Sequence, residues 1–174
     1  MKRWVTALNV WQNNEHTMTL EDNKAVIRRL FDAFNKGDLN ALDGVFAASA
    51  VDHMPIEGQA PGVEGFKQRI AALRTSLPDA SFTIESMIAE KDIVAERWTL
   101  RGTHGGEFMG IPATGKQVKA DMMSFNVLVD GKIIERWRVF DSLDVMQQLG
   151  GRPSGGAEQK KAEYYTGKEV KGHK

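Results

Sequence analysis

The sequence of 174 residues contains no cysteine, and this absence excludes several kinds of functional site. Without thiols the chain can form no disulfide framework, no thiolate zinc site and no iron–sulfur cluster, and it has no thiol nucleophile. No apolar run approaches the roughly 20 residues that a membrane-spanning helix needs. The formal net charge is zero, with 23 basic and 23 acidic residues, so we expect no broad surface for nucleic acid. This composition is typical of an ordinary soluble globular protein.

The two ends of the chain differ from its middle. Residues 1–18 show no sustained hydrophobic period, and we expect a partly ordered N-terminal extension there. The first residues loosely resemble a signal peptide, but Thr6 and Asn9 interrupt the apolar stretch and no small-residue cleavage site follows, which favours a cytoplasmic protein. Residues 151–174 contain six basic and three acidic residues among several glycines, and they predict a flexible, lysine-rich tail. The body, residues 19–150, has the length of one domain.

The first half of the body predicts three helices. Thr19 and Asp22 form a variant of the capping box, and Gly37 ends the helix that follows. Asp38 can cap a second, short helix, and a short extended segment at residues 50–54 comes before the third. The apolar stripes of the first and third helices contain Ile27, Leu30, Phe31 and Phe34, and Val63, Phe66, Ile70 and Leu73, respectively.

The second half of the body has the two-residue period of strands. The pattern predicts four strands, at residues 82–88, 93–103, 118–129 and 133–141. Asp130-Gly131 is a strong hairpin turn, and a short helix over residues 143–149 follows the last strand. Helices first and strands afterwards indicate an α+β domain, with the N-terminal helices packed on one face of a strongly curved antiparallel sheet. Such a sheet leaves a cone whose open end is a natural small-molecule pocket.

Asp141 is a candidate general base. It ends the last strand, after Trp137 and Val139 on the same pleat face, where desolvation would raise the pKa of a carboxylate towards the range useful for proton transfer. Asp141 also precedes the final helix, so it can equally be the N-cap of that helix. The sequence is compatible with both roles.

Two histidines and one arginine are further candidates. His53 and His104 both lie where a strand runs into a loop, and they either meet at one rim of the pocket or are unrelated surface residues. No helical His-x-x-x-His spacing occurs, so we expect no metal site. Arg97 lies inside a strand, where a structural ion pair is the expected role. The glycine-rich loop at residues 105–115 lacks the Lys-Ser/Thr ending of a phosphate-binding loop.

Taken together, several fragments of the body resemble the SnoaL-like polyketide cyclase (ester cyclase) family of the NTF2-like superfamily. The resemblance covers residues 22–150, and its specificity comes from the order and spacing of the fragments. The fragments are Asn23–Gly37, Asp52-His53-Met54-Pro55, Leu77-Pro78-Asp79, Arg101–His104, Gly106–Pro112, Thr114-Gly115-Lys116, Asp130–Ile133, Trp137, Asp141 and Gln147–Gly150.

The resemblance implies a cone-shaped α+β barrel with a hydrophobic cavity and no cofactor. In characterised cyclases of the family a buried aspartate, which matches Asp141 here, is the acid/base of an intramolecular aldol closure of a polyketide methyl ester. His53 and His104 match cavity histidines of the family. The ligand that this implies is a small hydrophobic or aromatic carbonyl compound. We expect the pocket wall to contain Phe31, Phe34, Phe108, Trp137 and Val139.

Other functions are possible on the same fold. A non-catalytic ligand-binding module would use the same cone, and nothing in the sequence excludes it. An enzyme resembling limonene-epoxide hydrolase needs a carboxylate two residues after Arg97, where this chain has Thr99. An enzyme resembling ketosteroid isomerase needs a carboxylate base at the position of Met54. Both of these enzyme classes are therefore disfavoured.

The central strands also suggest an interface between copies of the chain. We expect apolar residues near the middle of the sheet to lie on its outer face, where superfamily relatives commonly pair. The chain would then form a homodimer or a higher homo-oligomer, with no membrane and no nucleic acid as partner. The residues expected at this interface are Trp98, Leu100, Met122 and Met123.

Overall fold

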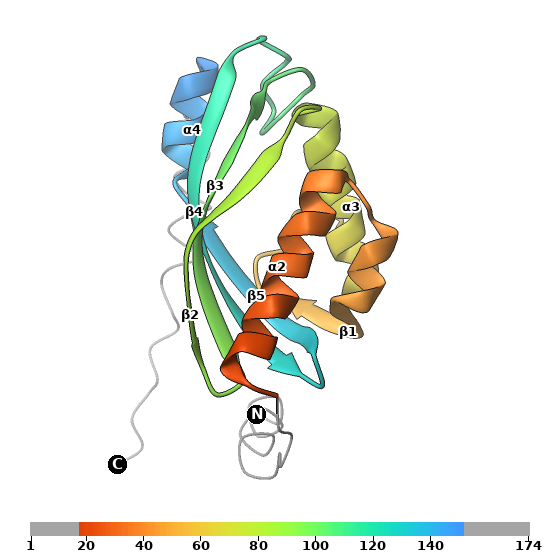
Figure 1. The fold of residues 1–174 in the computed structure, drawn as a ribbon. Coiled ribbons are helices and arrows are strands. Elements are labelled where there is room, and N and C mark those ends of the chain that lie inside the picture. The colour runs from red at the N-terminus through yellow and green to blue at the C-terminus, as the bar shows by residue number, and fades with distance from the viewer. Residues whose placement is uncertain (1–17, 152–174) are drawn as a thin grey trace, which may run out of the picture.

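A computed structural model describes residues 18–151 of the chain, so nearly all of the predicted tail and of the predicted N-terminal extension lies outside the described residues. Figure 1 shows the two longer helices, over residues 20–36 and 62–76, packed together on one side of a curved sheet. In chain order, the elements are α2 (Leu20–Lys36), η1 (Asn40–Gly44), β1 (Phe46–Asp52), α3 (Gly62–Ser76), β2 (Ser81–Glu90), β3 (Ile93–Thr103), β4 (Gln117–Val129), β5 (Lys132–Phe140) and α4 (Ser142–Leu149). Within the described part of the chain, no helix is long and apolar enough to cross a membrane.

The first helix begins and ends where the sequence predicts. The backbone N–H of Asp22 donates to the hydroxyl of Thr19 at 3.1 Å, and the backbone N–H of Thr19 donates back to the carboxylate of Asp22 at 3.0 Å. Gly37 ends α2 in the left-handed conformation, with φ of 67°. The capping box and the glycine therefore fix both ends of a helix whose apolar stripe is buried against the sheet.

The sheet has the strand order β1-β5-β4-β3-β2. The strands from β2 to β5 form the predicted antiparallel meander, which confirms the α+β class. One detail of the prediction is wrong: β1 pairs with β5 in parallel, so the sheet is mixed. Between β1 and β5 the chain passes through α3 and three strands, and this long path sets the direction of β1. A local sequence pattern does not show such a path.

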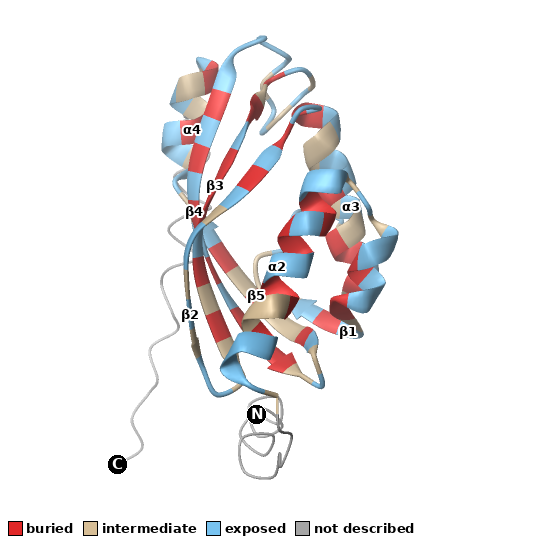
Figure 2. Cartoon of the chain, viewed as in Figure 1, coloured by how far each residue is buried: buried red, intermediate tan, exposed pale blue. Residues whose placement is uncertain are grey.

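The concave face of the sheet and the helices enclose the core. Figure 2 shows buried and exposed residues alternating along β4, as expected when one face of a strand is covered. Aromatic rings join the layers: Phe31 of α2 meets Trp98 of β3 edge to face at 5.3 Å, and Phe46 of β1 stacks on Phe66 of α3 at 4.0 Å. The helices α2 and α3 are thus fixed over a sheet that curves around them.

Most residues of the predicted interface lie on the opposite face. Trp98, Leu100 and Met122 are buried on the concave side, and only Met123 lies outside, where 58% of its surface is exposed. The reason is the period of two: Met122 and Met123 must face opposite ways, and Trp98 is the cross-strand partner of Met122. The exposed apolar residues of the outer face instead include Met123, Phe125, Val139 and, on β2, Ile88.

Candidate active site

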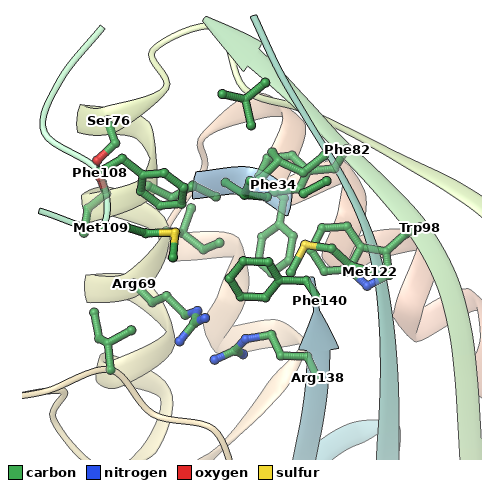
Figure 3. A pocket seen from close by; sticks show the side chains of 18 of the residues that line it. Phe34, Arg69, Ser76, Phe82, Trp98, Phe108, Met109, Met122, Arg138 and Phe140 are labelled. Atoms are coloured by element: carbon green, nitrogen blue, oxygen red, sulfur yellow. The ribbon is translucent and has the colours of Figure 1, made fainter. Parts of the chain in front are cut away.

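A cavity of about 390 Å³ lies between α3 and the concave face of the sheet. Its wall is mainly apolar and strongly aromatic. Side chains from α2, α3, β2, β3, β5 and the glycine-rich loop converge on it, and Figure 3 shows several of them from close by. The aromatic residues of the lining are Phe34, Phe66, Phe82, Trp98, Phe108 and Phe140. A cavity of this volume and lining accommodates a small, flat, largely apolar molecule.

Three arginines, Arg69, Arg136 and Arg138, give this cavity a charged end, which we call the arginine end. Arg69 comes from α3, whereas Arg136 and Arg138 alternate on the concave face of β5. In Figure 3 the side chains of Arg69 and Arg138 point towards one another across the cavity. The cavity therefore combines an apolar body with one strongly cationic wall.

Arg138 is fixed by a carboxylate that the sequence analysis did not single out. Its Nη2 donates to Oδ2 of Asp52 at 2.7 Å, and both side chains are at least 94% buried. Burial alone would raise the pKa of Asp52, but the charge of Arg138 and hydrogen bonds from Arg138, Gln59 and the backbone of Met54 outweigh it and lower that pKa. Asp52 is thus an ionised partner of Arg138.

Arg136 lies deeper and belongs to a buried network. It donates to Glu96 at 3.0 Å, to Asn126 at 2.7 Å and to Ser124 at 2.9 Å, and the indole N–H of Trp98 donates to Ser124 as well. Burial raises the pKa of Glu96, an effect that the charge of Arg136 opposes. Because every member of the network has a partner, the polar groups beneath the cavity are fixed in place.

Arg69 forms no salt bridge within 4 Å among residues 18–151, although Asp52 is near enough to act on its charge. Its Nη1 donates to the carbonyl oxygen of Met54 at 3.1 Å, and that oxygen also accepts from Nη2 of Arg138 at 3.0 Å. Burial lowers the pKa of Arg69, while the charge of Asp52 raises it. The described residues contain no group of three or more side chains suited to hold a metal ion.

Comparison with known proteins agrees with this architecture. The family model of the SnoaL-like polyketide cyclases matches residues 24–149. The chain belongs to this family. A curated relative, the aklanonic acid methyl ester cyclase DauD of Streptomyces sp. (strain C5), is 27% identical over 131 residues, which cover 72% of this chain and 80% of DauD.

Solved structures show the same SnoaL-like fold. IdmH from Streptomyces antibioticus is 33% identical with a TM-score of 0.67, over 74% of this chain and 98% of IdmH. TsrD from Streptomyces laurentii superposes with a TM-score of 0.72 over 78% of this chain and 99% of TsrD, and its 24% identity supports the fold alone. The family and fold expected from the sequence are therefore confirmed.

The expected pocket wall of this SnoaL-like protein is partly wrong. Phe34 and Phe108 line the cavity, but Phe31 lies behind it in the core. Trp137 and Val139 lie on the outer face of β5, because the alternate residues Arg136 and Arg138 point inwards. The side of β5 that looked apolar in sequence is thus the outer side. Arg97 is also exposed on the outer face, where its charge helps to lower the pKa of Asp121, although the two form no salt bridge within 4 Å.

The structure does not bring the two histidines together at the cavity. The ring of His53 stacks on Trp137 at 3.8 Å, and its Nε2 lies 2.7 Å from the carboxylate of Glu135. His104 is completely buried, and its Nδ1 lies 2.9 Å from the hydroxyl of Thr114. Neither histidine lines the cavity, since His53 belongs to an outer aromatic cluster and His104 to the base of the glycine-rich loop.

Asp141 is the N-cap of α4. Its Oδ1 accepts a hydrogen bond from the backbone N–H of Asp144 at 2.9 Å, and the residue is exposed. It does not line the cavity, although the preceding residue, Phe140, does. The aspartate therefore lies one residue beyond the cavity wall, and the arginine end supplies the polar groups that point inside.

Proposed function

We propose that this SnoaL-like protein closes a ring within a polyketide-like carbonyl or ester compound by an aldol-type reaction that needs no cofactor. The observation that carries this proposal is the cavity itself, an aromatic chamber with cationic side chains at one end. The curated relatives of this chain are named as aklanonic acid methyl ester cyclases, which supports the reaction class.

The proposed reaction moves one proton and forms one carbon–carbon bond. A base takes the acidic proton from a carbon next to a carbonyl group, the resulting enolate carbon attacks a second carbonyl of the same molecule, and the new alkoxide takes up a proton. The product is an isomer of the substrate. Conjugation in a polyketide-like substrate spreads much of the negative charge of the enolate. The protein must therefore supply a base, a dry cavity and positive charge that stabilises the enolate.

The cavity residues meet two of these needs, the dry cavity and the complementary charge. The aromatic wall can hold a flexible chain folded, so that the two carbonyl groups meet, and it excludes water from the enolate. The arginine end supplies positive charge in a poorly solvated space, where charge acts strongly. For the base we retain Asp141, which matches the aspartate of the family; one of its oxygens caps α4, and it follows the cavity residue Phe140 directly.

The test is a cyclisation assay with aklanonic acid methyl ester, followed by chromatography and mass spectrometry for a product of unchanged mass. Because general base catalysis typically contributes about 10²–10⁴-fold, Asp141→Asn should lower turnover by that factor. Asp144→Asn is the matched control, since it removes the same charge from the first turn of α4. Saturable binding of the ester without turnover would support a non-catalytic binding module instead. Undiminished turnover by Asp141→Asn would remove Asp141 from the mechanism.

A further inference from the structure

Two arginines of the cavity share one backbone oxygen. Arg69 and Arg138 both donate to the carbonyl of Met54, over 3.1 and 3.0 Å, so their donor nitrogens are at most 6.1 Å apart. Figure 3 shows the two side chains pointing towards one another from opposite sides of the cavity. Two guanidinium groups thus lie close together at the partly desolvated arginine end of the cavity.

The nearby carboxylates do not balance this charge. Asp52 is already occupied, because it accepts from Arg138, from the amide of Gln59 and from the backbone N–H of Met54. Glu96 is occupied by Arg136 and Asn126. Three guanidinium groups therefore share two carboxylates, and Arg69 forms no salt bridge within residues 18–151. The acidic residue that lines the cavity, Glu107, is exposed on the glycine-rich loop.

The arginine end also has hydrogen-bond donors to spare. The Nε of Arg138 is buried and has no partner, although only 6% of this side chain is exposed. Arg69 uses one nitrogen, Nη1, of the three in its guanidinium group. Burial and the neighbouring charge of Arg69 lower the pKa of Arg138 to about 9, with Asp52 opposing them. An anion between the two arginines would accept from the guanidinium group of Arg69 and relieve the repulsion between the two charges.

We infer that the natural ligand carries a carboxylate, and that Arg69 and Arg138 bind it at the arginine end of the cavity. A carboxylate has two oxygens in one plane, which suits a pair of guanidinium groups, and the aromatic wall suits the flat body attached to it. The ligand class is therefore an aromatic or polyketide-like carboxylic acid. This inference rests on the proposed function only in placing the ligand in the same cavity.

The experiment compares two probes of nearly the same shape, one anionic and one neutral. Anthraquinone-2-carboxylate and the neutral anthraquinone-2-carboxamide are titrated into the full-length protein at pH 7, and their dissociation constants are measured by calorimetry. A charged hydrogen-bond pair favours the acid, so we expect the carboxylate to bind about 10- to 100-fold more tightly than the amide.

Substitutions of single arginines test whether the preference for the carboxylate over the amide comes from the arginine end. Arg69→Met should remove most of the preference while leaving the affinity for the amide within about twofold of the wild type, because its apolar stem preserves the wall. Arg97→Met is the matched control: it removes the same charge from the exposed outer face, so the preference should persist. Arg69 is the better target because Arg138 also holds the buried Asp52.

Three results would overturn the inference: equal affinities for acid and amide, an unchanged preference in Arg69→Met, or no binding of the acid at millimolar concentration. Each is separate from the cyclase proposal. A protein that cyclises the methyl ester but binds acid and amide equally would keep the proposed reaction and lose the carboxylate site. A protein that binds the acid through Arg69 but turns over no ester would keep the site and lose the proposed reaction.

Discussion

Asp52 and Arg138, which are 86 positions apart in the chain, form a buried ion pair with a nitrogen–oxygen distance of 2.7 Å. Asp52 is the last residue of the edge strand β1, and Arg138 lies near the end of β5. The pair therefore fastens the parallel edge of the sheet at the point where the register between β1 and β5 resumes after an irregularity. It also holds Arg138 in position at the cavity.

The first prediction concerns pH. The pKa of Asp52 is lower in the folded protein than its ordinary value of 3.8, so its stabilising effect is complete above that value and is lost as the pH falls through the folded pKa. Asp52→Asn leaves Arg138 buried without its charge partner and should cost about 3–5 kcal/mol at pH 7.

The measurement is urea unfolding of the wild type and Asp52→Asn between pH 7 and pH 3. We expect a constant difference in unfolding free energy down to about pH 4, and a smaller one below it. Asp43→Asn, which removes an exposed carboxylate paired with Lys67, is a suitable control. A difference between wild type and Asp52→Asn that does not change with pH would contradict the assignment.

The second prediction concerns the network beneath the cavity. Glu96→Gln keeps the shape of the side chain but leaves Arg136, which is 1% exposed, without a negative partner. We expect the free energy of unfolding to fall by about 3–5 kcal/mol, whereas the double change Glu96→Leu with Arg136→Met should recover much of this loss. Chemical denaturation measures the free energy of unfolding of the single and of the double variant. A free energy of unfolding unchanged by Glu96→Gln would contradict the prediction, because it would mean that water solvates the charge of Arg136 in place of Glu96.

The third prediction concerns association. Met123, Phe125 and Val139 expose apolar surface on the outer face of the sheet, and we expect two copies of the chain to pair there. Phe125→Lys should convert the dimer into a monomer in sedimentation experiments at micromolar concentration. Leu20→Lys, at an exposed apolar position of α2 on the helix side of the sheet, is the control and should leave the dimer intact. A wild-type monomer would refute the prediction.

Local sequence patterns were sufficient for most of the fold. The capping box at Thr19, the stop at Gly37 and the Asp130-Gly131 turn all act between neighbouring residues, and each lies where the pattern predicts. The parallel pairing of β1 was missed because strand direction at an edge depends on the path of the whole chain.

The cavity was harder to predict because its inner face is charged. On β5 the alternation of Arg136 and Arg138 with Trp137 and Val139 is visible in the sequence, and burial of the apolar set is the ordinary expectation. The arginines point inwards because Glu96 and Asp52, on other strands, balance their charge. These partners lie 40 and 86 positions away in the chain, so a local sequence pattern cannot predict them.

The base of the glycine-rich loop is closed by backbone hydrogen bonds from one residue. His104 donates its N–H to the carbonyl of Lys116, and its own carbonyl accepts from the N–H of Gly115. The loop between these points, which contains the cavity residues Phe108 and Met109, is held by this ring at the end of the β3–β4 pair and by hydrogen bonds between its first residues and Ser76 at the end of α3. Insertions, deletions or exchanges within the loop can therefore reshape one wall of the cavity while the strands of the sheet keep their register. Ligand preference can thus diverge among family members without a new fold.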